Sequence, residues 1–356
     1  MRRKIYVVSW IAIALFLLAG VAYAGSQKED AGSGTDEKGL VIGEIFWGLH
    51  DSYQQAHQKA AADYLEELGI EFIPMDGQMK PEVQAAAMED LIARQVDGII
   101  CQAYDQATME VAIKAAQDAG IPVVSFVNVA SAGSSYPTMM IEERPGSIAM
   151  GELVATKVLE FFPGTPIRIA SISDPAVGWA HDQRTEAFIK GIRNIAPDAE
   201  WVFNGGESNR EVAYSTAEDI LQRHPDANVV YGYNAENVLG ALAAFEAAGR
   251  GLAKNGAPVS EVFAGVDGSV PEIVKIANPN STFNATLALQ PRANARKSID
   301  MLLKIINGEL DMHATDKNEV VVSFVVNGWE MSIDEIQAFL LEQWSIEIDL
   351  RKEIGM

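Results

Sequence analysis

The chain has 356 residues, a formal net charge of −22 at pH 7 and a hydrophobic content of 48%. This length is typical of two domains, and the apolar content is enough to give each a core. The strong negative charge argues against nucleic acid or an anionic membrane surface as a partner, because both attract basic surfaces.

The first residues form a secretory signal pattern. Arg2, Arg3 and Lys4 precede an apolar stretch over 5–20, and Ala22-Tyr23-Ala24 supplies the small-x-small site that signal peptidases accept. Residues 1–24 are therefore predicted to be a signal peptide that is cut before Gly25. The alternative is an uncleaved membrane anchor, since the apolar run through Ala24 is just long enough to span a bilayer.

The next part of the chain is predicted to be a flexible leader, and the sequence contains a single cysteine. Residues 25–39 are polar and glycine-rich and show no periodicity, which is typical of a flexible segment. Cys101 is the only cysteine, so no thiol near the cut could carry a lipid and no internal disulfide can form. Cys101 lies in an apolar run and is expected to be an inert core thiol.

From Leu40 onward, short apolar runs alternate with amphipathic helices. The expected strands are 40–43, 71–73, 98–101, 123–126, 167–172, 201–203, 228–231, 262–266 and 282–289. The expected helices are 52–68, one that Pro81 opens, 108–119, 147–161, 183–195, 210–222 and 236–247. This alternation predicts an α/β protein with two doubly wound parallel-sheet lobes. Ligands of such sheets bind beyond the carboxyl ends of the strands.

The last residues, 328–356, contain one further helical pattern. Ile333, Ile336, Phe339, Leu340 and Trp344 have helical spacing. A helix that docks on the second lobe is favoured over an arm that binds a partner.

Motifs of catalysis are absent from the sequence. It contains no G-x-S-x-G, no P-loop, no H-E-x-x-H and no G-x-G-x-x-G after a strand, and it has no C-x-x-C for zinc. We therefore expect a protein that is not an enzyme and that uses no cofactor and no metal. A secreted hydrolase remains the alternative from a different functional class.

The loop after the first strand is rich in aromatic side chains. Phe46, Trp47 and Tyr53 surround Asp51 at the start of a helix. Rings stack on the C–H faces of sugars while carboxylates bind hydroxyls, so this cluster indicates a sugar or polyol site. The alternative is that Asp51 caps the helix and the rings belong to the core.

Polar and aromatic residues also follow the other strands. The candidate ligand contacts among them are Gln102, Tyr104, Asn128, Trp179, Asp182, Arg184, Asn234, Asp267 and Gln290. Helix caps and turns favour the same residue types at these places, which could account for some of them individually. Capping explains less well why the pattern recurs in both halves of the chain.

From Leu40 to about Val326, the chain resembles the periplasmic sugar-binding proteins of the ribose-binding, LacI-type superfamily. The resemblance is carried by stretches that include IGEIFWGLHDSYQQ, GIPVVSF, HDQRTEAFIKGI, YGYNAENVLGALAAFEAAGR and FAGVDG. The DNA-binding relatives carry an N-terminal helix-turn-helix, and here an export signal takes its place. The resemblance implies the type I periplasmic binding protein fold, in which two lobes close around one ligand.

The resemblance also implies the lobe limits. The N-terminal lobe would comprise residues 40–142 and 290–318. The C-terminal lobe would comprise residues 143–289 and 319–356, the latter including a C-terminal extension. A three-segment hinge would join the lobes, with crossings near Glu142, Leu289 and Glu319.

Position by position, some of the family's binding residues match and others do not. Asp51, Tyr53, Gln102, Asn234 and Asp267 fall on the family's polar and aromatic positions. The departures are Gln54 and Ser208 in place of rings, Val127-Asn128 in place of Asp-Arg, and Asp182 in place of an arginine that Arg184 follows two residues later. The last hinge glutamine falls on Leu289 or, with a one-residue shift, on Gln290.

The function implied by the resemblance is that of a monomeric periplasmic protein which delivers a small polar ligand to an ABC permease in the inner membrane. A sugar or polyol is the expected ligand. Because arginine forks and rings that bind a pyranose are replaced here, a furanosyl compound and a cation stay open. A sensor that docks on a chemoreceptor or histidine kinase is the alternative role.

Overall fold

The computed structural model describes residues 39–127, 134–175 and 178–356. The predicted signal peptide and the candidate residue Asn128 lie outside these ranges, as does nearly all of the predicted leader. Residues Val41–Met356 form one compact unit. Within the described ranges, no helix is both long enough and apolar enough to cross a membrane.

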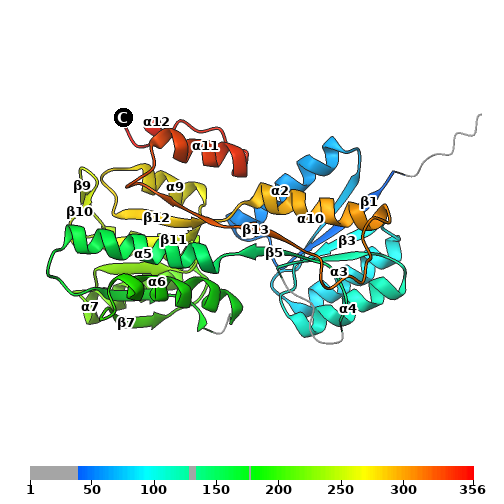
Figure 1. Ribbon diagram of the computed structural model, residues 1–356, viewed down its shortest axis with the longest axis horizontal. Coiled ribbons are helices and arrows are strands. Elements are labelled where there is room, and N and C mark those ends of the chain that lie inside the picture. The colour runs from blue at the N-terminus through cyan, green and yellow to red at the C-terminus, as the bar shows by residue number, and fades with distance from the viewer. Residues whose placement is uncertain (1–38, 128–133, 176–177) are drawn as a thin grey trace, which may run out of the picture. The chain divides into compact units, whose positions relative to one another are not determined.

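The first sheet has six strands in the order β13-β5-β4-β3-β1-β2, and every neighbouring pair is parallel. These strands are β1 (Val41–Phe46), β2 (Glu71–Asp76), β3 (Gly98–Cys101), β4 (Val123–Phe126), β5 (Thr138–Glu142) and β13 (Asn318–Val322). The helices around this sheet are α2 (Ser52–Glu67), α3 (Pro81–Arg94), α4 (Gln106–Asp118) and α10 (Pro291–Ile306). Helix α2 packs against α10 and α3 against α4, so that helices flank the strands (Figure 1).

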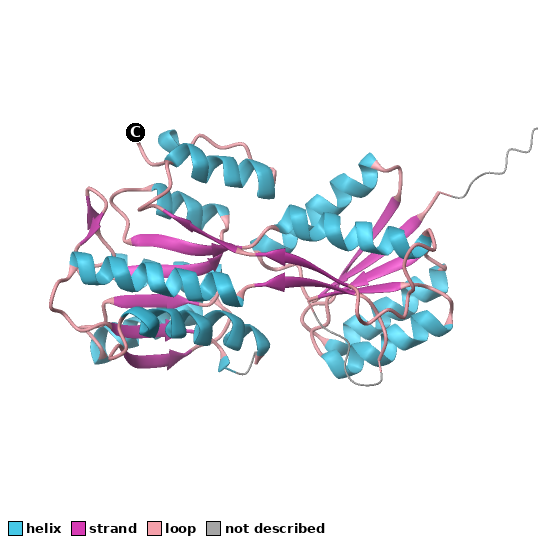
Figure 2. Ribbon diagram, in the orientation of Figure 1, coloured by secondary structure: helices cyan, strands magenta, loops and turns pink. Residues whose placement is uncertain are grey.

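The second sheet also has six strands, in the order β14-β12-β11-β8-β6-β7. These are β6 (Arg168–Ile172), β7 (Glu200–Gly205), β8 (Val229–Gly232), β11 (Val262–Asp267), β12 (Phe283–Ala288) and β14 (Phe324–Asn327). Its helices are α5 (Arg144–Phe161), α6 (Ala187–Ile195), α7 (Arg210–Arg223), α8 (Ala235–Ala247) and α9 (Val270–Ala277). A two-stranded hairpin of β9 (Ala253–Lys254) and β10 (Ala257–Pro258) lies beside it (Figure 2). The second sheet is parallel except at one edge, where β14 runs antiparallel to β12.

Close helix packing beside the second sheet depends on a glycine. Helices α5 and α6 pair along their length. A Cβ atom on Gly191 of α6 would collide with the carbonyl oxygen of Ile148 in α5. A side chain at position 191 would therefore force these helices apart.

The chain crosses between the sheets three times. It leaves the first sheet after β5 and returns between β12 and α10. The third crossing comes at Ser323, between β13 and β14, and not near Glu319, because Glu319 is paired with Met139 inside the first sheet. The limits of the two lobes otherwise stay a prediction.

Several elements differ from those expected. The helix predicted over 183–195 begins with a π-helical segment, η2 (His181–Glu186), before α6. The strands predicted at 98–101 and 123–126 are confirmed as β3 and β4, which are buried along their whole length. Strand β5 and helices α9 and α10 had no counterpart in the predicted list of elements.

The C-terminal residues pack as the periodic pattern indicates. Helix α11 (Ile333–Trp344) contacts α9 beside the second sheet and also α10, and the short α12 (Leu350–Glu353) follows it. Phe339 of α11 meets the Phe324 ring edge to face at 5.5 Å. It also lies against Gly268, where φ is +71° and a Cβ atom would come within 3.2 Å of the Phe339 ring.

Candidate functional site

A cavity of about 1110 Å³ lies at the carboxyl ends of strands from both sheets. Loops after β1, β3 and β5 of the first sheet and after β6, β7, β8, β11 and β12 of the second supply its walls. This is the place where parallel α/β sheets bind ligands. The cavity is lined by rings, amides and carboxylates together with aliphatic side chains such as Val127, Ile141 and Leu289.

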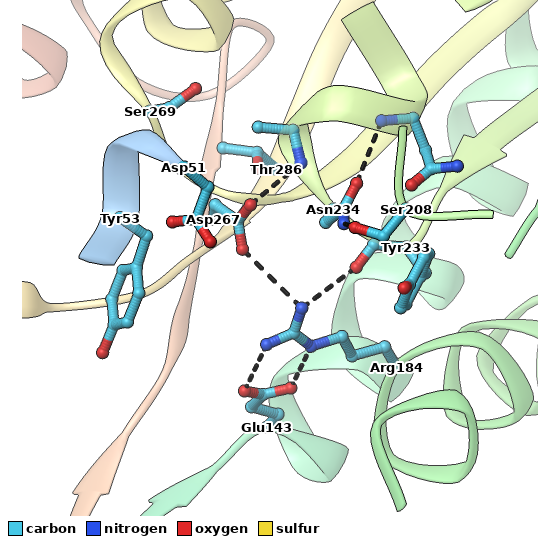
Figure 3. A network of polar contacts seen from close by, with 12 residues as sticks. Asp51, Tyr53, Glu143, Arg184, Ser208, Tyr233, Asn234, Asp267, Ser269 and Thr286 are labelled. Carbon is cyan, nitrogen blue, oxygen red and sulfur yellow. Dashed lines mark hydrogen bonds and ion pairs between the residues drawn. The ribbon is translucent and has the colours of Figure 1, made fainter. Parts of the chain in front are cut away.

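Arg184 is the centre of an ionic network on one side of the cavity (Figure 3). Its Nε and Nη2 atoms donate to the two carboxylate oxygens of Glu143, the latter bond measuring 2.9 Å. Its Nη1 atom donates to the Tyr233 carbonyl at 3.2 Å and lies 3.7 Å from Asp267 Oδ1. Although burial opposes the charged form of Arg184, the Glu143 carboxylate raises the pKa of the guanidinium above its usual value.

Asp267 is held in a strained position at the end of β11. Its φ is +112°, a region that residues other than glycine rarely adopt, and such strain concentrates at functional sites. Asp267 Oδ2 accepts a hydrogen bond from the Ala235 N–H at 2.9 Å, at the start of α8. Burial raises the pKa of Asp267 to about 7, although Arg184 and the Ala235 N–H oppose that rise.

The start of helix α8 fixes a second polar group. Asn234 is the N-cap of α8, and its side-chain oxygen accepts from the Asn237 N–H at 2.9 Å. The Asn234 amide nitrogen donates to Ser208 Oγ, which ties the loop after β7 to the loop after β8 (Figure 3). Asn234 therefore caps a helix and lines the cavity at the same time.

On the first-sheet side, the start of α2 provides three side chains. Asp51 caps the helix by accepting from the Gln54 N–H at 2.8 Å, and burial raises the pKa of Asp51. The Tyr53 hydroxyl accepts from Asn294 Nδ2 at 2.7 Å, and burial raises the pKa of Tyr53. Gln54 Nε2 donates to Gln102 Oε1 at 2.8 Å, which joins the loops after β1 and β3.

Two rings complete this side of the cavity. Trp47 and Tyr104 meet edge to face, with ring centroids 6.4 Å apart. Tyr104 is 45% exposed, so its ring is available to a ligand. Exposed rings of this kind stack on apolar faces or bind cations.

Gln84, which the sequence reasoning missed, holds the first-sheet loops in place. This fully buried residue of α3 donates through Nε2 to the carbonyls of Phe46 at 3.0 Å and Gln102 at 2.7 Å. Its Oε1 atom accepts from the Tyr104 N–H at 2.8 Å. Because Gln84 does not line the cavity, we describe it as a positioning residue.

Most of the predicted site residues come together in the cavity. Those that line it are Trp47, Asp51, Tyr53, Gln102, Tyr104, Trp179, Arg184, Asn234 and Asp267. Their role in binding stays a proposal.

Three predicted contacts lie elsewhere. Phe46 is 1% exposed and belongs to the core beneath the loop. Asp182 is exposed and forms an ion pair with Arg144 at 2.9 Å, since the π-helical segment places Arg184 and not Asp182 toward the cavity. Gln290 donates to the Val322 carbonyl at 2.7 Å, and its neighbour Leu289 lines the cavity instead.

Glu143 and Tyr233 are cavity residues that the sequence reasoning did not select. Glu143 directly follows β5, a strand that was not recognised, so the rule of strand ends could not be applied to it. Tyr233 directly precedes Asn234, and its carbonyl binds Arg184. Recognition of the strand over 138–142 would have identified Glu143.

One Ser-His-carboxylate arrangement in the second lobe resembles a catalytic triad only superficially. Ser173 Oγ lies 3.3 Å from His181 Nδ1, and His181 Nε2 lies 3.6 Å from Glu186. Ser173 is fully buried, and its hydroxyl donates to Asn204 Oδ1 at 2.6 Å rather than to the histidine. The serine is therefore neither accessible nor activated as a nucleophile.

A metal centre has no support in the described ranges. Across those residues, no group of three or more His, Cys, Asp or Glu side chains is arranged to hold a metal ion. Cys101 is buried, and burial raises the pKa of its thiol to about 12.

Comparisons with known proteins agree with this architecture. The ribose import binding protein of Bacillus subtilis is 23% identical over 311 residues, which cover 87% of this chain and 95% of that protein. The periplasmic binding protein of the arabinose ABC transporter from Shewanella, solved with L-arabinofuranose, has a TM-score of 0.72 at 23% identity and covers 84% of this chain and 95% of its own. A solute-binding protein from Bacillus halodurans with bound myo-inositol has a TM-score of 0.68 at 22% identity, covering 86% and 100%.

These likenesses confirm the α/β fold with two parallel-sheet lobes that was expected from the sequence. The family model described as the periplasmic binding protein domain matches residues 42–310, which is more than half of the chain. The chain therefore belongs to the periplasmic binding protein domain family.

Proposed function

We propose that this protein captures a small polar solute, of the sugar or polyol class, and delivers it to an ABC importer. The observation that carries the proposal is the cavity at the strand ends of both sheets, where rings and hydrogen-bonding groups are already fixed by their neighbours. Preorganised groups lose little entropy when a ligand binds. The ribose, arabinofuranose and inositol binding of the relatives supports the same class of solute.

The protein acts without catalysis in this proposal. Its site contains acceptors and rings that can hold hydroxyl groups, while the buried Ser173 offers no accessible nucleophile. The proposed ligand contacts are Trp47, Asp51, Tyr53, Gln102, Tyr104, Trp179, Arg184, Asn234 and Asp267.

The proposed setting is the periplasm, which is the location that the family implies. Export would use residues 1–24 as a cleaved signal, and the partner would be an inner-membrane permease that a monomer approaches. Mass spectrometry of protein recovered from the periplasm tests the cleavage. The expected mass is that of a chain beginning at Gly25, and an intact residue 1 in that fraction would contradict it.

Thermal unfolding against a panel of sugars and polyols tests the binding function. A ligand present at about 100 times its Kd stabilises the folded state by about 2.7 kcal/mol, which raises Tm by several degrees. Calorimetry should then give one site per chain. No shift with any member of a broad panel, together with turnover of a substrate, would reject the proposal.

A further inference from the structure

The described residues that line the cavity carry far more acidic than basic groups. Six of them are carboxylic acids, namely Asp51, Glu143, Asp174, Glu207, Glu236 and Asp267. The one guanidinium among them, Arg184, is already bound by both oxygens of Glu143. Outside the cavity, Arg210 pairs with Glu236 at 2.8 Å. The other basic side chain of the described wall is His50, whose Nε2 atom lies 3.9 Å from Asp51 Oδ2, so the carboxylic acids of this wall still outnumber its basic side chains.

Asp51 and Asp267 face this space from opposite sheets (Figure 3). Each carboxylate accepts one backbone N–H, from Gln54 and from Ala235. Arg184 lies 3.7 Å from Asp267 Oδ1, which is an ion-pair distance but too long for a hydrogen bond. After the larger effect of burial, the charge of Asp51 contributes to the raised pKa of Asp267. The two carboxylates thus repel each other across the cavity.

Gln54 supplies an independent acceptor at the same place. It is 2% exposed and lines the cavity, and its Nε2 atom is used in the bond to Gln102. Its Oε1 atom has no hydrogen-bond partner in the described structure. A buried oxygen without a donor is unfavourable, so this atom is available to accept a hydrogen bond from a bound molecule or from water.

We propose that the solute is a small hydroxylated amine, such as an amino sugar or an amino alcohol, whose ammonium group is bound by Asp51 and Asp267. The inference rests on the proposed function and narrows its ligand class. An ammonium ion has three donors and no acceptor, which matches an environment of two carboxylates and a free amide oxygen. The Trp47 and Tyr104 rings add faces that attract a cation and pack on C–H groups.

Binding of a cation also has a pH signature here. The charged and titratable groups around Asp267 are Arg184, Glu143, Asp51, Glu272, Tyr53, Tyr231 and Tyr233. An ammonium ion favours the ionised form of Asp267, so amine binding releases a proton from this carboxyl near neutral pH. For an amine that stays protonated over this range, such as glucamine, affinity should rise between about pH 6 and about pH 8, up to about tenfold, whereas affinity for a neutral polyol should not.

The test is calorimetry of the purified protein with matched pairs of solutes. Suitable pairs are glucosamine with glucose, galactosamine with galactose, and glucamine with sorbitol. We expect the amine of at least one pair to bind about tenfold or more tightly than its neutral partner near pH 7, where the amines are still largely protonated. Tight binding of neutral solutes without any preference for amines would overturn this inference and leave the proposed function intact. Binding of a neutral sugar or polyol from the wider panel, with no binding of any of the three amines, would likewise overturn this inference and leave the proposed function intact.

Variants separate the role of the carboxylates from a general loss of structure. Asp267→Asn and Asp51→Asn keep the side-chain shape, and each should reduce the amine preference about tenfold while thermal unfolding stays cooperative. Asp219→Asn is the matched control, because Asp219 is an exposed aspartate on α7 of the same lobe that pairs with Arg223. An unchanged amine preference in both site variants would overturn the inference.

Discussion

The two sides of the cavity are built from different interactions. On the second-sheet side, Arg184, Glu143 and Asp267 form a largely buried ionic network, in which Glu143 is 1% exposed and the other two side chains are each 14% exposed. On the first-sheet side, amides and rings predominate, and Tyr104 is nearly half exposed. Breaking a buried ion pair is strongly destabilising, whereas exchange of an exposed ring is not.

Because of this difference, we expect substitutions on the two sides of the cavity to have different effects on stability. On the ionic side, loss of the Arg184 charge would leave buried carboxylates without a counter-charge and would lower stability. The ring side can change its contacts while the strands behind it stay as they are.

The largest effect on stability is expected for Arg184→Met. The change leaves Glu143 and Asp267 buried without their counter-charge, so we expect the free energy of unfolding to fall by about 3–5 kcal/mol. Urea unfolding followed by circular dichroism measures it. Arg184→Lys is the control, because lysine keeps the positive charge but loses the bidentate contact with Glu143. Its free energy of unfolding should lie between those of Arg184→Met and the unaltered protein. A stability equal to that of the unaltered protein would show that the network contributes nothing.

Asp267→Asn tests how the stability of the second-sheet side depends on pH. The folded state keeps a proton on Asp267 up to about pH 7, while the unfolded chain loses it near pH 4. Stability therefore declines as pH rises through this window, and the neutral amide escapes that decline. We expect the variant to gain on the order of 2 kcal/mol above about pH 7 relative to the unaltered protein, and nothing below about pH 4.

Thermal unfolding across this pH range measures the difference. A gain that is the same at every pH would contradict the role of ionisation.

Gln84→Met probes how the ring side is held. Methionine keeps the volume but leaves the carbonyls of Phe46 and Gln102 and the Tyr104 N–H without their partner. We expect a loss of about 1–2 kcal/mol in stability and weaker solute binding. Gln117, whose amide binds loop carbonyls away from the cavity, gives the control variant Gln117→Met. Equal solute affinities in the two variants would show that Gln84 does not position the loops.

The smallest effect on folding is expected for Tyr104→Ala. Because the ring is exposed, stability should change by less than about 0.5 kcal/mol, while solute affinity should drop about five- to tenfold through the lost ring contact. Calorimetry and thermal unfolding of the same sample measure the two quantities. A large loss of stability would place Tyr104 in the core and remove the contrast between the two sides.

The sequence predicted the parts of the fold that depend on local pattern. The four-residue apolar runs of β3 and β4 and the helical spacing in α11 were sufficient to place those elements. Strand β5 was missed because two of its five residues are methionines, which do not favour strands, and one of its two pairing partners, β13, is about 180 residues further along the chain. Long-range pairing of this kind leaves no local periodicity.

The candidate site could be predicted where a residue follows a recognised strand, as Asp267 and Asn234 do. It could not be predicted where the local backbone decides the direction of a side chain. Asp182 and Arg184 were both predicted contacts, and in the π-helical segment only Arg184 lines the cavity. Gln290 does not line the cavity either, whereas its neighbour Leu289 does. Gln84 could not be predicted, because it lies within helix α3 and the rule used here selects only residues that follow the ends of strands.

The contact between Phe339 and Gly268 has a use beyond folding. Gly268 directly follows Asp267, so the ring of the C-terminal helix lies against the backbone that carries a cavity carboxylate. Leu341, two residues from Phe339, is 54% exposed and could carry a dye without loss of core packing. An environment-sensitive fluorophore on a cysteine at position 341 is expected to report cavity occupancy from outside, which would turn the protein into an optical sensor for its solute.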